Sequence, residues 1–269
     1  MLIHRIQEGV ELAARQGCEI VSLGAYTSIV TRDGRAIHPP PGIRLTTGNA
    51  LTVAVGANRI VEAVKGRSKG GPVNLAVVGA TGNIGSAISR QLLPGNHCFS
   101  EATLVAHHPG RLRALAEELR LQSPGVRVHV STDLADIRRA DVVVIAAATN
   151  EPLIYPHHLN PDREVLLADI SAPGVISPIV KSLENVHVIP MAGAVVLPGE
   201  SNFVMASHIP AGTAFCCAAE AMLLGLAAPS DLEPLRLLGR MDRITVDTLT
   251  KLAKQNGFLL PDVRRTREP

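Results

Sequence analysis

The sequence lacks tryptophan altogether, and aromatic residues make up only 2% of its 269 residues. Its charges nearly cancel, because 26 lysines and arginines stand against 24 aspartates and glutamates. A nucleic-acid-binding surface needs a basic field and, for single strands, aromatic side chains on which bases can stack. We therefore expect no nucleic-acid partner.

Cysteines are few as well, and none of the four has the C-x-x-C spacing of zinc sites. We expect neither a metal site nor a disulfide framework, but the reduced thiols of a cytoplasmic protein. The N-terminal residues do not have the long apolar segment of a signal peptide. The most apolar stretch, residues 209–228, contains Glu220 and is expected to be a buried helix, not a membrane span.

Between residues 72 and 205, apolar runs alternate with helical patterns. Helices are expected at residues 84–93 and 111–119. Uninterrupted apolar runs are typical of parallel strands that are covered on both faces. Such strands are expected at residues 73–78, 102–106, 126–130, 141–147, 165–169 and 186–190. The alternation predicts an α/β fold with a doubly wound parallel sheet, a Rossmann domain.

Both ends of the chain are richer in helical patterns. Helices are expected at residues 3–17, 49–64, 211–226 and 245–255, and short strands at residues 19–23 and 27–31. A charged, glycine-rich segment at residues 65–71 is the expected domain boundary. We therefore predict a helix-rich substrate and catalytic unit built from residues 1–68 plus 206–269, and an NADP-binding Rossmann domain at residues 72–205.

The heptapeptide G-A-T-G-N-I-G at residues 79–85 lies between an expected strand and an expected helix. That context is typical of a dinucleotide-binding loop. Gly79 permits the tight turn, Gly82 lets the backbone approach the pyrophosphate, and Gly85 allows close packing of helix and strand. The alternative is a glycine-rich turn without a ligand. We predict that the loop binds the cofactor phosphates through Gly79, Thr81, Gly82, Asn83, Ile84 and Gly85.

The end of the next strand indicates which dinucleotide is bound. Enzymes that use NAD usually have an acidic residue there, which accepts hydrogen bonds from the ribose hydroxyls. This chain has no carboxylate at that place, but His107 and, on the following helix, Arg111. Exposed loop histidines are the alternative interpretation. We predict NADPH, with its 2′-phosphate near these two residues and its nicotinamide near Ala147 and Ala148.

Two adjacent cysteines, Cys216 and Cys217, occur near the start of the expected helix at residues 211–226. They point in directions about 100° apart, so only one can face a given cleft. A helix N-terminus can lower a thiol pKa and so activate a nucleophile. A buried core cysteine beside alanines is the other interpretation, and the residue types leave both open.

Five blocks of sequence together resemble the long-chain fatty acyl-(acyl-carrier-protein) reductases of cyanobacteria, which form fatty aldehydes. The blocks are S-L-G-A-Y-T-S-I-V at residues 22–30, T-T-G-N-A-L-T at 46–52, V-V-G-A-T-G-N-I-G-S-A at 77–87, F-C-C-A-A-E-A-M-L-L at 215–224 and N-G-F at 256–258. The family has a further N-terminal domain that helps to bind the acyl chain, and this chain starts after it.

The resemblance implies an NADPH-dependent reduction of an acyl thioester, of acyl carrier protein or of CoA, to an aldehyde. Cys217 occupies the position of the family's reactive cysteine, three residues before Glu220, and would carry the acyl group. Candidate substrate-binding or oxyanion residues are Ser28, Thr46, Thr47 and Asn49. Thr47 or Asn49 could instead cap the following helix. A partner subunit that replaces the missing domain is a further expectation.

Two other functions remain open at this point. The layout is also similar to that of shikimate dehydrogenases, which would imply an NADP-dependent dehydrogenase of a small substrate without a covalent step. The lysine–aspartate pair of that group is not evident, because the first lysine is Lys65. The other function is a non-catalytic module that binds NADP or a partner.

Overall fold

The computed structural model describes residues 1–67, 72–95, 98–171, 173–189, 192–199, 201–206 and 209–259. The chain divides into two compact units, each of which is described here by itself. Unit 1 comprises Met1–Val55 and the described residues from Ala194 onward, and unit 2 comprises Gly56–Gly193. The division falls within helix α3 (Asn49–Lys65), whereas the predicted boundary was at residues 65–71, which lie partly outside the described residues.

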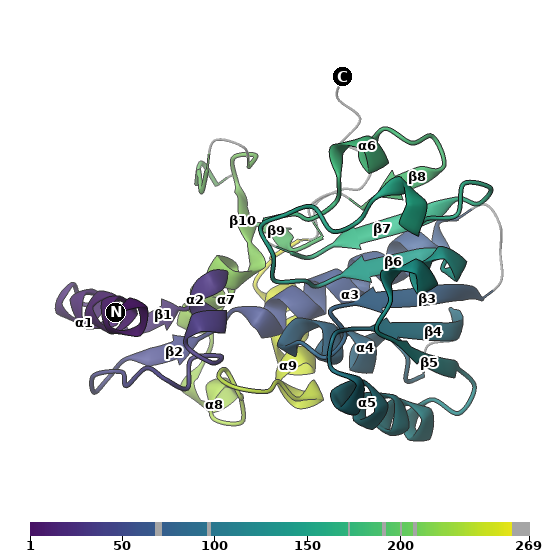
Figure 1. Cartoon of the computed structure of the whole chain (residues 1–269). Helices are drawn as coiled ribbons and strands as arrows, with labels where there is room; N and C mark the ends of the chain where they lie inside the picture. The colour runs from purple at the N-terminus through teal and green to yellow at the C-terminus, as the bar shows by residue number, and fades with distance from the viewer. Residues whose placement is uncertain are drawn as a thin grey trace. The chain divides into compact units, whose positions relative to one another are not determined.

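Unit 2 is built on a six-stranded sheet in which every neighbouring pair is parallel. The order is β5-β4-β3-β6-β7-β8, with the first strand of the unit in the interior (Figure 1). The strands are β3 (Val73–Val78), β4 (Phe99–Val105), β5 (Arg127–Ser131), β6 (Val142–Ile145), β7 (Val165–Asp169) and β8 (Val186–Val188). The predicted doubly wound parallel sheet is confirmed.

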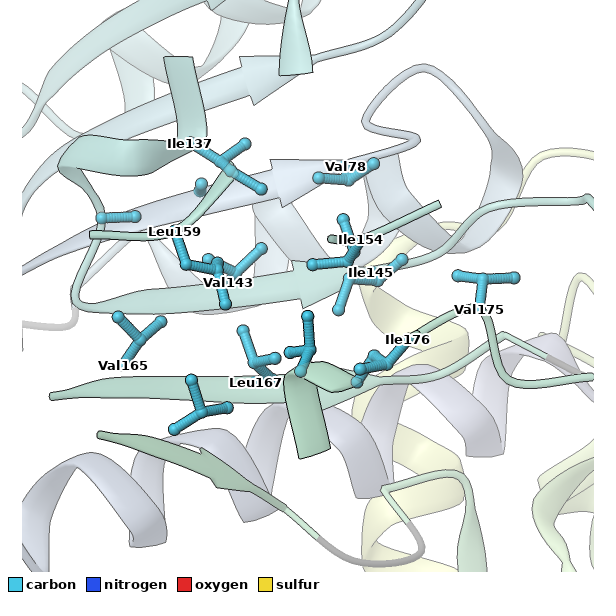
Figure 2. Close-up of a cluster of buried hydrophobic side chains, with 14 of the residues drawn as sticks. Val78, Ile137, Val143, Ile145, Ile154, Leu159, Val165, Leu167, Val175 and Ile176 are labelled. Carbon is cyan, nitrogen blue, oxygen red and sulfur yellow. The ribbon is translucent and has the colours of Figure 1, made fainter. Parts of the chain in front are cut away.

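One face of this sheet packs against helices α4 (Asn83–Leu92) and α5 (Pro109–Gln122), which connect β3 to β4 and β4 to β5. Right-handed crossovers place the connection from β5 to β6 on the opposite face. That connection holds only the short 3-10 helix η1 (Leu134–Arg139). Its Ile137 packs into a core with Val78, Val143 and other aliphatic side chains, several of them from the loops that follow β6 and β7 (Figure 2).

Unit 1 is mainly helical, which confirms a second, helix-rich domain. Its helices are α1 (Leu2–Arg15), α2 (Tyr26–Val30), the start of α3, α7 (Cys216–Leu226), α8 (Pro229–Leu232) and α9 (Arg243–Gln255). Two small sheets join them: β1 (Ile20–Ser22) runs parallel to β2 (Arg44–Thr46), and β9 (Ala194–Val196) runs antiparallel to β10 (Thr213–Phe215). Val10 of α1 packs with Leu23, Ile37 and Leu45 in a small core.

Two predicted elements of unit 1 differ from the structure. Residues 27–31, expected as a strand, belong largely to helix α2, because the Thr27 and Thr31 hydroxyls donate hydrogen bonds to carbonyls three and four residues earlier. The helix expected at residues 211–226 begins only at Cys216, because Thr213–Phe215 pair with β9. In both places tertiary or local hydrogen bonds override the apolar pattern.

Within the described parts of the chain, none of the helices combines the length and the hydropathy that a membrane span requires.

Candidate functional site

The glycine loop lies where β3 ends and α4 begins. Gly79 has a φ of +77°, and its carbonyl accepts a hydrogen bond from the Gly82 N–H at 2.9 Å. A Cβ on Gly79 would lie 2.3 Å from the Ala146 carbonyl oxygen, and a Cβ on Gly85 would lie 2.3 Å from the Gly79 carbonyl oxygen. The loop is thus a tight backbone cradle in which two of the three glycines have no room for a side chain.

The start of α4 has the properties of an anion site. Gly82 is the N-cap in an extended conformation, and no side chain caps the helix. The first N–H groups of a helix have no partner within the helix, and together with the helix dipole they favour a phosphate group. The side chains of Thr81, Asn83 and Ile84 are each half-buried or exposed, so the loop faces accessible space. The predicted phosphate-binding residues therefore lie together on one turn.

The segment between β4 and α5 places a histidine and an arginine side chain near a second helix start. His108 is the N-cap residue of α5, and Pro109 occupies its first turn. His107 and Arg111 are exposed, and neither the strand end nor the first turn of α5 carries an acidic residue. Because β4 lies beside β3, these groups flank the glycine loop at the same edge of the sheet. This arrangement can accept a phosphate on the ribose.

The carboxyl ends of β6 and β7 lie at the same edge of the sheet, on the opposite side of β3 from β4. The Ser171 hydroxyl accepts a hydrogen bond from the Ala147 N–H at 3.1 Å. The Asp169 carboxylate accepts hydrogen bonds from the Ser171 and Val175 N–H groups, at 3.0 and 2.7 Å. Ala147 and Ala148, predicted to lie near the nicotinamide, are held here. Sequence reasoning missed Asp169, although a carboxylate at the end of an apolar strand is a recognisable signal.

Cys217, the second residue of α7, lies in unit 1 in a closely packed setting. A Cβ on Gly24 would lie 3.0 Å from its Sγ, and a Cβ on Gly48 would lie 2.2 Å from its Cα. Burial raises the pKa of the Cys217 thiol and outweighs the N–H groups of Ala218, Cys217 and Ala25 that favour the thiolate. Of the two interpretations that the sequence left open, burial thus disfavours the thiolate more than the helix N-terminus favours it.

Glu220, one turn further along α7, is fully buried. It accepts a hydrogen bond from the Thr46 hydroxyl, and its other oxygen accepts one from the Leu51 N–H at 2.7 Å. Burial raises the pKa of Glu220 more than these hydrogen bonds lower it. The side chain ties α7 to the start of α3, which is a structural role that explains a carboxyl group in an otherwise apolar helix.

The four predicted oxyanion residues are also buried in unit 1. The Ser28 hydroxyl donates to the Ala25 carbonyl at 2.8 Å. The Thr46 hydroxyl donates to Glu220, and the Thr47 hydroxyl donates to the Leu237 carbonyl at 3.4 Å. The Asn49 N–H donates to the Thr47 hydroxyl at 3.4 Å, which matches the capping role weighed for Thr47. An oxyanion role for these residues stays a prediction that the structure does not test.

The substitution Glu220→Gln is expected to weaken the pH dependence of stability. Because the pKa of Glu220 is raised by folding, the folded state holds a proton that the unfolded state releases. The free energy of unfolding should therefore fall as the pH rises. The fall begins near the ordinary glutamate pKa of 4.5 and ends near the raised pKa of Glu220 in the folded state. Glutamine keeps the size and carries no charge, so this decline should shrink.

Urea unfolding followed by circular dichroism between about pH 5 and pH 8 measures this. Glu19→Gln, at an exposed position of the same unit, is the control and should leave the decline unchanged. An equal decline in wild type and in Glu220→Gln would show that another group causes it.

Part of unit 2 matches a known protein family. Residues 62–192 match the model of a family described as Shikimate / quinate 5-dehydrogenase. Aminotransferase PigE of Serratia sp. (strain ATCC 39006) is 26% identical over 277 residues, and the alignment covers 96% of this chain. The chain spans 30% of the length of that relative.

Solved structures of similar fold are distant in sequence. Quinate dehydrogenase from Corynebacterium glutamicum, in complex with NAD, is 17% identical over 51% of this chain and 50% of its own, with a TM-score of 0.39. The ligand-free 5-ketofructose reductase of Gluconobacter sp. strain CHM43 is 13% identical over 74% of this chain and 63% of its own, also with a TM-score of 0.39.

These findings correct the expected family. The nucleotide-binding segment is similar to shikimate and quinate dehydrogenases, so the predicted membership of the fatty acyl reductases is wrong, and with it the acyl-thioester reaction through Cys217. The match agrees with the predicted oxidoreductase and, at the level of NAD(P), with a nicotinamide cofactor. The expectation of an acyl-carrier partner depended on the discarded family.

Proposed function

We propose that this chain is an NADP(H)-dependent dehydrogenase of a small hydroxylated substrate, which it oxidises or forms without a covalent enzyme intermediate. The observation that carries the proposal is the glycine cradle at residues 79–85, in a segment that matches the shikimate and quinate dehydrogenase family. A Cβ at Gly79 or Gly85 would collide with backbone atoms, which fits a loop whose close packing serves to present N–H groups to phosphate.

The residues that would hold the cofactor follow from this geometry. The first N–H groups of α4, which begins at Asn83, would bind the pyrophosphate, and His107 and Arg111 would bind the 2′-phosphate. Ala147 and Ala148, whose backbone is fixed through Ser171 and Asp169, would border the nicotinamide. The bound cofactor supplies the hydride acceptor or donor, and the protein binds and orients it.

A non-covalent reaction agrees with the state of Cys217. Burial raises the pKa of its thiol, which disfavours the thiolate that covalent catalysis requires. The family supplies the substrate class, since shikimate and quinate are small hydroxylated carboxylic acids. We therefore expect a substrate of this class, an alcohol or the corresponding ketone.

The test is hydride transfer to NADP⁺ with a panel of shikimate, quinate and other small alcohols and amines. We expect turnover of at least one of them, and Cys217→Ser should keep it within about threefold of wild type because no covalent step is involved. Turnover that disappears in a folded Cys217→Ser protein would contradict the proposal. Cofactor binding without turnover on any of these compounds would instead favour the nucleotide-binding module.

Substitution of Arg111 by alanine should weaken NADPH binding and leave NADH binding unchanged. A charge-assisted hydrogen bond to phosphate contributes about 1.5–3 kcal/mol, so we expect a loss of roughly tenfold or more for NADPH alone. Arg113→Ala removes an exposed arginine from another side of the same helix and is the matched control. Both cofactors are titrated by calorimetry into wild type, Arg111→Ala and Arg113→Ala. An equal loss of NADH affinity in Arg111→Ala would show that Arg111 does not bind the 2′-phosphate.

A further inference from the structure

The face of the unit 2 sheet that carries η1 is not fully covered. Only ten residues connect β5 to β6, and η1 accounts for six of them. In a doubly wound sheet a long helix normally covers each face, which is why the strands are apolar on both sides. The six-residue η1 instead covers the part of the face near Ile137, Val143 and Val78 (Figure 2).

The uncovered part of this face is polar. Alternate residues of a strand point to the same face, so Glu101 and Thr103 of β4 share a face with His129 and Ser131 of β5. Asn74, near the start of β3, completes the row. None of these five side chains is fully buried. This polar sheet face, as we call these five residues, has no role in the dehydrogenase site.

Two adjoining hollows lie over the polar sheet face. The larger has a volume of about 550 Å³ and the smaller of about 210 Å³, and Asn74, Glu101, Asp136 and Arg139 line both. Arg138, Asn160 and Arg163 further line the larger one. Its volume lies in the range of small-molecule sites in proteins. Asn74 and Gly79 lie at opposite ends of β3, about 16 Å apart, so the hollows are separate from the glycine loop.

Some positive groups around the larger hollow form no direct ion pair, although Arg139 is near enough to Glu101 to help lower the pKa of that carboxyl. Glu101 is paired with Arg127, whose hydrogen bond is the main cause that lowers the pKa of that carboxyl. Asp136 accepts a hydrogen bond from the Ser131 hydroxyl at 2.5 Å. In the described part of the chain, the guanidinium groups of Arg138 and Arg139 make neither a hydrogen bond nor an ion pair. Arg163 lies 3.9 Å from Asp141.

We propose that the larger hollow is a second binding site, which takes a small molecule with phosphate or carboxylate groups through Arg138 and Arg139. Guanidinium groups bind both kinds of anion through paired N–H donors. Asn74 and Asn160 also line this hollow. The site depends only on unit 2, and does not require that the proposed dehydrogenase function is correct.

The experiment titrates sodium pyrophosphate and, separately, sodium citrate into the full chain by calorimetry at constant ionic strength. The titrations are run without and with NADPH, and the variants distinguish heat that arises at the hollow from heat that arises at the glycine loop. The proteins are wild type, the double variant Arg138→Gln with Arg139→Gln, and Arg113→Gln as a control on α5. All three arginines are exposed, so the fold should be unchanged, and circular dichroism verifies this.

We expect at least one of the two anions to bind wild type and Arg113→Gln equally, and the double variant at least tenfold more weakly. The preferred anion distinguishes phosphate from carboxylate ligands. In wild type, the bound anion should also slow hydrogen exchange at the amides of η1, which does not depend on any variant. The proposal is overturned if neither anion binds or if the three proteins bind equally.

Discussion

In the Gly79→Ala protein we expect NADPH affinity to fall by roughly 100-fold, which corresponds to the loss of about two charge-assisted hydrogen bonds to phosphate. The new Cβ would lie 2.3 Å from the Ala146 carbonyl oxygen, and the φ of +77° is strained for alanine. The loop must therefore move, and its N–H groups move with it. Calorimetric titration with NADPH measures the effect.

A matched control separates this collision from backbone strain alone. Gly95 has a φ of +68° in the same unit, and a Cβ there would meet nothing within 4 Å. Gly95→Ala should therefore bind NADPH as wild type does. If Gly79→Ala proves unstable, Gly82→Ala serves instead, since its Cβ comes no nearer than 3.2 Å to the Gly79 carbonyl oxygen. Normal NADPH binding in both Gly79→Ala and Gly82→Ala would contradict the assignment of the loop.

The second large effect concerns stability, at Gly48 in unit 1. A Cβ on Gly48 would lie 2.2 Å from the Cys217 Cα, and its φ is +70°. Neither the α7 backbone nor the start of α3 can yield easily, because Glu220 ties them together. Gly48→Ala should lower the free energy of unfolding by roughly 3 kcal/mol or more, from overpacking and backbone strain together.

Gly17→Ala is the control for this substitution. Gly17 also has a positive φ, +78°, but a Cβ there meets nothing within 4 Å. Only the strain of about 1 kcal/mol should remain. Circular dichroism in urea suits both proteins, since the chain has no tryptophan for fluorescence. An equal loss of the free energy of unfolding in Gly48→Ala and Gly17→Ala would show that overpacking against Cys217 does not destabilise the Gly48→Ala protein.

The Rossmann sheet could be predicted from sequence because its strands are buried on both faces. Val73–Val78 and Val142–Ile145 are almost uninterrupted apolar runs, and such runs leave few alternatives to interior parallel strands. The glycine loop was predictable for a related reason, since the spacing of its glycines reflects backbone contacts that admit no Cβ. Local pattern and tertiary structure agree at these places.

Unit 1 was harder to predict because long-range contacts decide its local structure. Thr213–Phe215 were predicted as part of a helix, but they pair with Ala194–Val196, which lie far away in the sequence.

The hollow beside η1 in unit 2 could not be predicted either. Asn160 and Arg163 come together with Arg139 only through the fold. Periodicity cannot report contacts of this kind.

The expected acyl reductase chemistry is contradicted by the family match of residues 62–192, and the structure offers another account of the sequence blocks that suggested it. The blocks around Gly24, Gly48 and Cys217 do meet in the fold, but they meet as a packing arrangement. Both glycines lie against Cys217, a half-buried residue whose thiol pKa is raised by burial. Small residues that recur in one order along a chain can therefore reflect close packing as readily as catalysis.

The most direct test of the account is a crystal structure of this chain with bound NADPH. It should show the pyrophosphate against the first N–H groups of α4, which begins at Asn83, and the 2′-phosphate beside His107 and Arg111. Bound NADPH elsewhere on the molecule, or protein that remains free of cofactor at millimolar NADPH, would contradict the account.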